Sequence, residues 1–181
     1  MRRWQSGQRV DETDAGSAGN RVVLRPLTED DLHVVAPWYE GVQGHRRRLE
    51  QVRAHSSRGL LAITRLDDDA PIGVLEYRVG YPAEGWLCVG FVAVEPPLRG
   101  LGFGSEAVRL LEEEALRRGR ARRFCAEVPL GNGTGLYFWL RLGYRPVGPG
   151  EDHWPGRRPR GIIGMMREFE NLGPRTAYVS F

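Results

Sequence analysis

The residues best suited to chemistry in this sequence are three alternate glycines that lie between an apolar run and an amphipathic stretch. Gly100, Gly102 and Gly104 separate that run from an amphipathic stretch that begins at Glu106. Glycines let the backbone turn its N–H groups inward, because no Cβ stands in the way. A helix start adds N–H groups without intrahelical partners and a partial positive charge. The pattern therefore predicts a cradle for a phosphate or pyrophosphate, to which Arg99 can add a charged contact.

Two other interpretations of the glycine motif compete with a phosphate cradle. A dinucleotide-binding fingerprint has the spacing G-x-G-x-x-G and follows the first strand of a βαβ unit. Here the spacing is G-x-G-x-G and the motif follows a later strand, which argues against a dinucleotide. The second alternative is a glycine-rich turn that only connects a strand to a helix, since an isolated glycine motif has little specificity.

The elements before the glycine motif follow from the hydrophobic pattern. Alternating polar and apolar residues predict a strand over 21–25, after which Thr28 is expected to cap a helix with an acidic first turn. Pro37 is expected to end or kink that helix. An arginine-rich stretch over 43–55 is expected to form a short surface helix.

The remaining elements alternate between strands and helices. Strands are expected over 60–64 and 72–79 as a hairpin, and over 86–94 as an apolar strand buried on both faces. A helix over 106–118 is expected to end at Gly119. After it we expect a strand over 123–128, a helix over 135–142 and strands over 144–147 and 162–167. This order predicts an α/β (α+β) fold: a single mixed, mostly antiparallel sheet of six to seven strands with helices on both faces.

Length and composition are those of a globular chain. Of its 181 residues, 41% are hydrophobic and 27% charged, which suits one domain. We expect a disordered segment over 1–20, a domain over 21–170 and a tail over 171–181. The first segment lacks the apolar core of a secretory signal, and no apolar run approaches the roughly 18 residues of a membrane helix. These features predict a cytoplasmic protein without a membrane partner.

Residue counts exclude several classes of function. All 26 basic residues are arginine, whereas a Walker P-loop, a protein kinase and a pyridoxal-phosphate enzyme each need a lysine. Cys88 and Cys125 cannot form a disulfide framework, and with four scattered histidines they show no metal-ligand spacing. We expect both to be buried thiols and expect no metal. Acidic residues at 67–69 and 112–114 interrupt the arginine runs, which argues against a nucleic-acid partner.

Three spaced motifs resemble the GNAT family of N-acetyltransferases. The pattern R-x-x-G-x-G over 99–104, preceded by Val-Ala-Val and followed by an amphipathic helix, resembles the acyl-coenzyme A signature of the family. Asn132 and the stretch 135–144 resemble its second motif, an asparagine followed by a small residue, an aromatic pair and Gly-aromatic. The opening stretch 21–39, which contains LRPLTEDDL, resembles its first strand and helix. The resemblance covers residues 21–168 in the order of the family.

The resemblance implies acetyl-coenzyme A (acetyl-CoA) as the co-substrate. Backbone N–H groups over 100–104 would hold its pyrophosphate, while the strand over 92–94 would separate from its neighbour and pair with the pantetheine amides. The acyl carbonyl would then lie against a strand N–H that stabilises an oxyanion, and Asn132 would lie beside the pantetheine arm. The implied acetyl-CoA-binding residues are Val92, Ala93, Val94, Arg99, Gly100, Leu101, Gly102, Phe103, Gly104, Ser105, Asn132 and Trp139.

The general acid departs from the pattern of the family. Many members place a tyrosine seven residues after the asparagine to protonate the leaving thiolate, but here that position is Trp139. Tyr137 is the nearest candidate, although a helix turns by about 200° over two residues. The alternative role for the aromatic residues over 137–139 is packing against the sheet and the cofactor.

The general base departs from the pattern as well. Family members often use a glutamate on the fourth strand, acting through water, but Cys88 falls near that position and the strand has no acid. Glu76 on the preceding strand and Glu84 in the following loop are the nearest candidates. We expect both as solvated surface carboxylates, which is the usual place for this residue type.

The resemblance implies an N-acetyltransferase that moves an acetyl group from acetyl-CoA to a primary amine by direct attack in a ternary complex. The alternative is an acyl-CoA-binding sensor or scaffold of the same fold without turnover, suggested by the missing tyrosine and strand acid. The acceptor would be a small-molecule amine or a peptide N-terminus. The apolar residues of the tail over 171–181 are a candidate contact for a homodimer.

Overall fold

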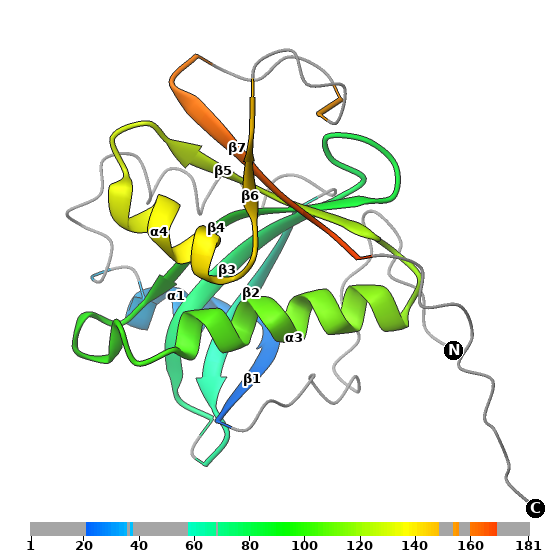
Figure 1. The fold of residues 1–181 in the computed structure, drawn as a ribbon. Coiled ribbons are helices and arrows are strands. Elements are labelled where there is room, and N and C mark those ends of the chain that lie inside the picture. The colour runs from blue at the N-terminus through cyan, green and yellow to red at the C-terminus, as the bar shows by residue number, and fades with distance from the viewer. Residues whose placement is uncertain are drawn as a thin grey trace, which may run out of the picture.

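A single seven-stranded sheet forms the centre of the molecule (Figure 1). The computed structural model describes residues 21–35, 37, 58–67, 69–148, 154–155 and 160–169. The strand order is β1-β2-β3-β4-β5-β7-β6, and within the described ranges only the β4–β5 pair is parallel. This confirms the predicted mixed, mostly antiparallel sheet. The elements are β1 Val22–Pro26, α1 Glu29–Val35, β2 Arg58–Arg65, β3 Pro71–Val79, β4 Trp86–Val94, the short 3-10 helix η2 Pro96–Leu98, α3 Phe103–Arg117, β5 Arg123–Pro129, α4 Gly133–Arg141, β6 Arg145–Val147 and β7 Ile162–Glu168.

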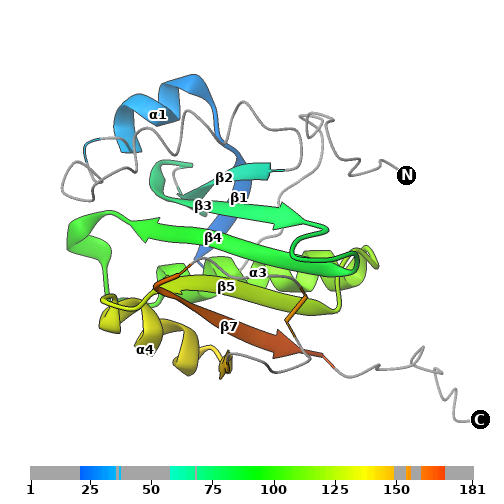
Figure 2. The same ribbon diagram turned by 90° about the horizontal axis from the view of Figure 1, so that it is seen from above.

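Helices cover both faces of the sheet, as predicted. Helix α1 lies on one face and α3 and α4 lie on the other (Figure 2). Val35 of α1 packs on Val74 of β3, whereas Val108 of α3 belongs to the main core together with Leu75 and Val89. Successive residues of a strand point to opposite faces. Leu75 therefore faces α3, and Val74 faces the side of α1.

Two differences from the predicted elements affect the site. Helix α3 begins at Phe103, three residues earlier than predicted, because Gly102 adopts a left-handed conformation (φ 91°) and serves as its N-cap. Strand β4 is buried over 86–89 and again at Val94, whereas Phe91 and Ala93 are half-buried. The predicted helix over 43–55 lies outside the described residues.

Thr28 caps α1 as predicted, and its partner in the cap is Asp31. The N–H of Asp31 donates to Thr28 Oγ1 at 3.2 Å, and the N–H and hydroxyl of Thr28 both donate to Asp31 Oδ2 at 2.8 Å. Arg25 of β1 adds two bonds to the buried Asp31 carboxylate, at 2.6 and 2.9 Å. Burial raises the pKa of Asp31, but Arg25 and Thr28 outweigh burial, so that pKa lies below its ordinary value.

A second buried carboxylate connects α3 to β7 and to the residue before β6. Glu112 of α3 accepts from the Tyr144 hydroxyl at 2.6 Å and from Arg167 Nη1 at 3.0 Å. Burial raises the pKa of Glu112, and the two donors offset part of that effect. The network fixes the residues before β6 and the strand β7 relative to α3.

The Asp31 contacts predict a pH-dependent loss of stability in the variant Asp31→Asn. We expect a loss of about 1–3 kcal/mol at pH 7, the usual range for hydrogen bonds to a charged group. The folded-state pKa of Asp31 lies below its ordinary 3.8. The contribution is therefore complete above about pH 4 and is lost as pH falls through the folded pKa. Urea unfolding from pH 7 to pH 2.5 measures this.

The exposed Asp30, one residue away, supplies the control variant Asp30→Asn, for which we expect little change. An equal deficit of Asp31→Asn at pH 7 and pH 2.5 would show that the ion pair is not its cause.

Candidate active site

The glycine motif forms a loop of backbone N–H groups at the start of α3. Gly100 and Gly102 have φ values of 79° and 91°, a region that glycine enters without strain. Among the described residues, the amides over 101–105 donate to no backbone carbonyl; the amide of Glu106 is the first of α3 to do so, to Gly102 O at 3.0 Å. These amides and the helix N-terminus form a positively polarised loop, and its role in binding a phosphate stays a prediction.

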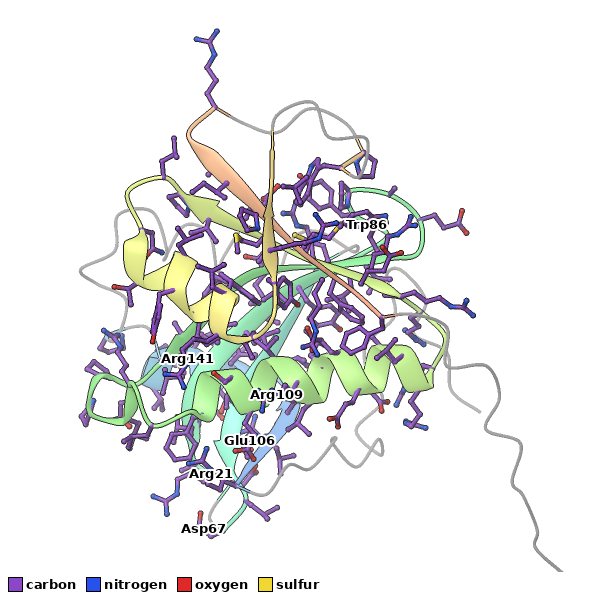
Figure 3. The ribbon with its side chains drawn as sticks, in the orientation of Figure 1. Arg21, Asp67, Trp86, Glu106, Arg109 and Arg141 are labelled. Carbon is purple, nitrogen blue, oxygen red and sulfur yellow. The ribbon has the colours of Figure 1, made fainter. Side chains whose placement is uncertain are left out.

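Arg21, immediately before β1, stabilises this loop through hydrogen bonds to Glu106 and Leu101. Its backbone N–H and Nε–H donate to the two carboxylate oxygens of Glu106 at 2.8 and 3.0 Å, and Nη1–H donates to Leu101 O at 3.0 Å. Its guanidinium also lies 4.6 Å from the centre of the Phe103 ring. Figure 3 shows Arg21 beside the first turns of α3, next to Glu106. The side chain thereby fixes a loop carbonyl on the outer side of the loop.

Arg99 closes the inner end of the same loop. Its Nε–H donates to the carbonyl of Val94, the last residue of β4, at 2.8 Å. The loop is thus held at both ends by an arginine, with the amides over 101–105 between them.

Strands β4 and β5 separate next to this loop. Their parallel pairing covers only four residue pairs, from Trp86–Arg123 to Val89–Ala126. Beyond that point β4 continues to pair with β3, and β5 continues to pair with β7. The two strands therefore diverge toward the glycine loop, as the resemblance implied for the strand over 92–94.

A β-bulge lies at the point of separation, and a glutamate is buried against it. The register of β3 and β4 shifts between Glu76–Phe91 and Tyr77–Val89, which leaves Gly90 as the extra residue. A Cβ on Gly90 would lie within 2.7–2.9 Å of the Glu76 carboxyl group. The side chain of Glu76 is 0% exposed, so the prediction of a solvated surface carboxylate is wrong there. The absent side chain of Gly90 leaves the space that the carboxyl group fills.

The comparisons with known proteins agree with this geometry. The model of the acetyltransferase (GNAT) family matches residues 27–144, which is more than half of the chain. The chain belongs to the GNAT acetyltransferase family. No protein of curated function matches the sequence significantly.

Solved structures of GNAT proteins share the fold at low sequence identity. A probable GNAT-family acetyltransferase from Chromobacterium violaceum is 24% identical with a TM-score of 0.70, over 91% of this chain and 90% of that one. An acetyltransferase from Agrobacterium tumefaciens is 16% identical with a TM-score of 0.70, over 90% and 99%. A third, from Salmonella typhimurium, modifies the N-terminal serine of ribosomal protein L7/L12; it is 16% identical with a TM-score of 0.65, over 84% and 97%.

Three other residues predicted for catalysis or cofactor binding lie away from the point where β4 and β5 separate or are enclosed in the core. Glu84 is exposed in the loop before β4, at the opposite end of that strand from the glycine loop. Tyr137 is 62% exposed on α4, and its ring lies 5.8 Å from the Arg141 guanidinium. Trp139 is only 6% exposed and packs edge-on against Tyr144 at 4.7 Å in the core. Trp139 is thus a packing residue, and its contact with a cofactor stays a prediction.

Asn132 has a structural role at the start of α4. Its Oδ1 accepts from the N–H of Gly135 at 2.8 Å, so it is the N-cap of the helix. A Cβ on Gly135 would lie 2.5–3.0 Å from the Asn132 side chain, which explains the small residue three positions later. The cap lies just past the end of β5 and fixes where α4 starts beside the separated strands.

Cys88 and Cys125 are buried free thiols, as predicted. They lie opposite each other in the β4–β5 register. Burial raises the pKa of the Cys125 thiol well above its ordinary value, which keeps it protonated and unreactive.

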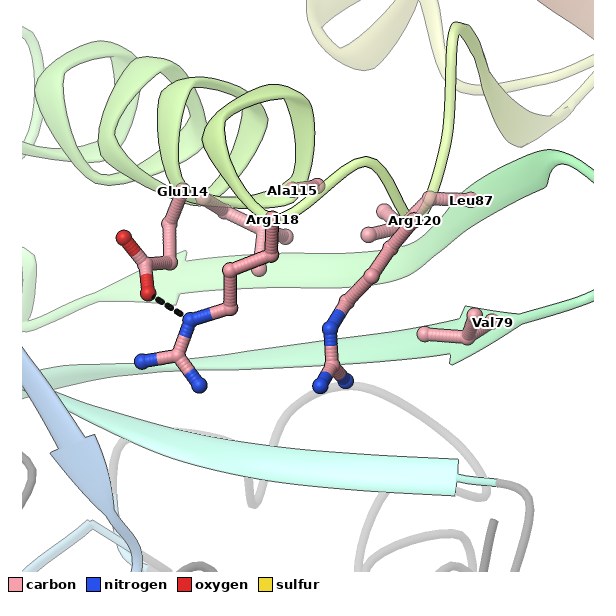
Figure 4. Close-up of a pocket in the computed structure, with 7 residues that line it drawn as sticks. Val79, Leu87, Glu114, Ala115, Arg118 and Arg120 are labelled. Atoms are coloured by element: carbon pink, nitrogen blue, oxygen red, sulfur yellow. Dashed lines mark hydrogen bonds and ion pairs between the residues drawn. The ribbon is translucent and has the colours of Figure 1, made fainter. Parts of the chain in front are cut away.

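Two hollows lie away from the glycine loop. A cavity of about 10 Å³ lies beneath the C-terminal end of α3, between Leu87 and the side chains of Arg118 and Arg120 (Figure 4). A groove at the end of the sheet near Trp86 is lined by five arginines and two glutamates.

The described ranges contain no helix that is long and apolar enough to cross a membrane. They also contain no group of three His, Cys, Asp or Glu side chains placed as metal ligands would be.

Sequence reasoning missed two groups of residues that the fold brings to the site. Arg21 was assigned only to a strand, and nothing in its spacing from Glu106, 85 positions later, indicates the contact. The ion pair between Arg78 and Glu127 joins residues 49 positions apart. Arg78 follows Glu76 by two residues, so the alternation of β3 is the only local signal that the two share a face.

The cap predicts that Asn132→Ala destabilises the protein by about 0.5–2 kcal/mol, whereas Asn132→Ser, which keeps an oxygen acceptor, stays close to wild type. Urea unfolding of both variants measures this, with Thr134→Ala on the exposed surface of the same turn as the control. Equal losses from the serine and alanine variants would contradict the capping role.

Proposed function

We propose that this chain transfers an acetyl group from acetyl-CoA to a primary amine, by direct attack in a ternary complex. The observation that carries the proposal is the cradle of backbone amides at the mouth of the separating strands. The cradle suits a pyrophosphate, and the gap between β4 and β5 suits an extended arm that reaches from it into the sheet.

The residues present fit acetyl-CoA. The amides over 101–105 and the start of α3 would hold the pyrophosphate, with Arg99 and Arg21 keeping the loop in place. The stretch 92–94 of β4 borders the gap and would hold the pantetheine arm. Gly104 lies close to the core here, because a Cβ on it would contact Val92, Val94 and Phe138 at 3.4–3.6 Å. Bound acetyl-CoA supplies an activated thioester, whose acetyl group passes to the amine while the thiolate leaves.

Glu76 is the better candidate of the two for the general base. Its carboxyl group lies at the bulge where the strands separate. Glu84 is exposed in the loop before β4, and β4 itself starts four residues, or about 13 Å, before Gly90. A substrate ammonium, with a pKa near ~10, must lose its proton before attack. Glu76 would accept that proton, directly or through a water.

Tyr137 is the candidate general acid, because Trp139 is enclosed by the core. The contribution of a general acid is small here, since a thiolate with a thiol pKa near ~8.5 leaves readily at neutral pH. The alternative function, an acyl-CoA sensor without turnover, gains support from the missing tyrosine. The buried carboxyl group at the strand separation favours turnover.

The acceptor class and the partners remain proposals as well. The Salmonella neighbour modifies an N-terminal serine, which supports including a peptide N-terminus with small-molecule amines among the candidate acceptors. A cytoplasmic location, a homodimer and the absence of nucleic-acid and membrane partners stay predictions. The tail suggested for a dimer lies outside the described residues.

The amide cradle predicts selective stabilisation by acetyl-CoA. We expect acetyl-CoA, but not NADH, to stabilise the protein by about 2.7 kcal/mol at a hundredfold excess over its Kd, measured by thermal unfolding. We expect Gly100→Ala to weaken acetyl-CoA binding about tenfold, since alanine at φ 79° is strained by about 1–2 kcal/mol and shifts the loop.

Gly119→Ala is the matched control, because Gly119 also has a positive φ, of 65°, and open space around it, yet lies at the other end of α3. We expect similar destabilisation without loss of binding. Unchanged affinity in Gly100→Ala, or no response to millimolar acetyl-CoA, would contradict the cradle.

The placement of Glu76 predicts that Glu76→Gln lowers kcat for amine acetylation by about 10²–10⁴, the usual contribution of general base catalysis. Acetyl-CoA affinity should not change, and Glu84→Gln should retain activity. Steady-state kinetics with a panel of amines measures both variants. Loss of activity in Glu84→Gln rather than in Glu76→Gln would reverse the assignment.

A further inference from the structure

Arg21 connects the edge of the sheet to the glycine loop through its backbone and its side chain. Its carbonyl accepts from the N–H of Leu66, just after β2, at 3.0 Å, and its own N–H donates to Glu106 at 2.8 Å. The side chain donates from Nε to Glu106 and from Nη1 to Leu101 O, both at 3.0 Å. Arg21 is therefore fixed to the sheet on one side and to the loop on the other.

The bond to Leu101 sets the direction of a loop amide. In a trans peptide the C=O and the N–H of the next residue point in opposite directions. Because Arg21 holds Leu101 O on the outer side of the loop, the N–H of Gly102 points to the inner side. Gly102 also makes room for Arg21, since a Cβ there would lie 3.1 Å from Arg21 Nη2. The arginine thus orients one of the amides that would face a phosphate.

Glu106 by itself would oppose the binding of an anion at this loop. It lies in the first turn of α3. A carboxylate there stabilises the helix, but it competes with an incoming anion for the partial positive charge of the helix N-terminus. The Glu106 side chain is only 18% exposed, so water and salt screen its charge incompletely.

Arg21 supplies the compensating charge. Its N–H and Nε–H engage both carboxylate oxygens of Glu106. Of the other charges labelled beside it in Figure 3, Asp67 is paired with Arg65. Arg109, one turn further along α3, forms no ion pair with Glu106 within the described ranges. The charge of Glu106 is therefore cancelled chiefly by a residue 85 positions earlier in the chain.

We propose that Arg21 is a positioning residue for the phosphate-bearing end of the acyl donor, which acts by cancelling the charge of Glu106 and orienting the Gly102 amide. The role rests on the acetyl transfer proposed above. Arg21 contacts the loop and not the reacting atoms. Affinity for donors that carry phosphates therefore depends on Arg21, whereas kcat and the affinity for phosphate-free donors do not.

Two variants that break the same ion pair distinguish charge compensation from structural support. Arg21→Met leaves Glu106 uncompensated, so we expect the Kd of acetyl-CoA to rise about five- to tenfold. Glu106→Gln removes the carboxylate, so we expect the Kd to stay constant or to fall by up to about threefold. Isothermal titration calorimetry measures both. A structural tie predicts weaker binding in both variants, and that result would overturn the proposal.

Restoring the charge balance should restore the affinity. We expect the double variant Arg21→Met with Glu106→Gln to bind acetyl-CoA within about threefold of wild type. Arg21→Lys keeps the charge, but one ammonium group does not replace the guanidinium that bonds both Glu106 and Leu101, so we expect a loss of about threefold. A double variant as weak as Arg21→Met would contradict charge compensation.

A donor without phosphates separates the loop from the rest of the site. S-Acetylpantetheine has the same thioester and pantetheine arm as acetyl-CoA. In Arg21→Met we expect the KM of acetyl-CoA to rise about five- to tenfold at unchanged kcat, and the KM of S-acetylpantetheine to change less than about twofold. Equal rises in KM for both donors would show that Arg21 only supports the fold.

Arg123→Met is the matched control. Arg123 is 51% exposed, against 48% for Arg21, and it also donates from Nε to a glutamate, Glu168, at 2.8 Å. Its guanidinium lies 5.8 Å from the Trp86 ring, at the end of the sheet away from the glycine loop. The substitution lowers the net charge equally, and we expect no change in Kd or KM. A rise like that of Arg21→Met would assign the effect to net charge and refute the proposal.

The same measurements separate failure of this role from failure of the proposed activity. If wild type binds acetyl-CoA but acetylates no amine, the transfer fails, while the four affinities still decide the role of Arg21. If amines are acetylated and the variants bind acetyl-CoA equally, only the role of Arg21 fails. Absence of acetyl-CoA binding by wild type would refute both.

Discussion

The arrangement of this site depends on two parallel strands that stay paired for only four residues. Strand β4 keeps β3 as a partner, and β5 keeps β7, so each remains anchored when the two part after Val89 and Ala126. A parallel pair requires a crossover connection, and here that connection contains the glycine loop and α3. The same constraint therefore opens the gap and places the start of a helix beside it. Asn132 then starts α4 directly after β5, which closes the other side of the opening.

The sheet also keeps two opposite kinds of charge apart. On the side of α3, backbone amides and a helix N-terminus present partial positive charge, and Arg21 and Arg99 hold the loop that carries them. On the opposite face, Glu76 and Glu127 present carboxylates. Because alternate residues of a strand point to opposite faces, the glutamates stay apart from the amide cradle although both lie beside the same gap.

The fold and the loop were predictable from sequence because their signals are local. Alternation, glycine spacing and helix caps identified most elements, and Thr28 caps α1 as its residue type predicts. Helix α3 begins three residues earlier than expected. Its N-cap is Gly102, which acts through its backbone conformation, and glycine has no side chain that would have indicated a cap. The burial of Glu76 was missed because it depends on the absent side chain of Gly90, on another strand. The contacts of Arg21 with Glu106 and of Arg78 with Glu127 span 85 and 49 positions, and only the finished sheet brings them together.

Stability alone does not account for the polar groups at this opening. A buried ion pair contributes little net stability, because desolvation of the two charges offsets their attraction. The amides at the start of α3 are donors that no backbone carbonyl of the described residues accepts. Such groups are tolerated where a ligand completes them, as in sites organised before binding. The amides border the place where β4 and β5 part, so a ligand that enters the gap can complete them.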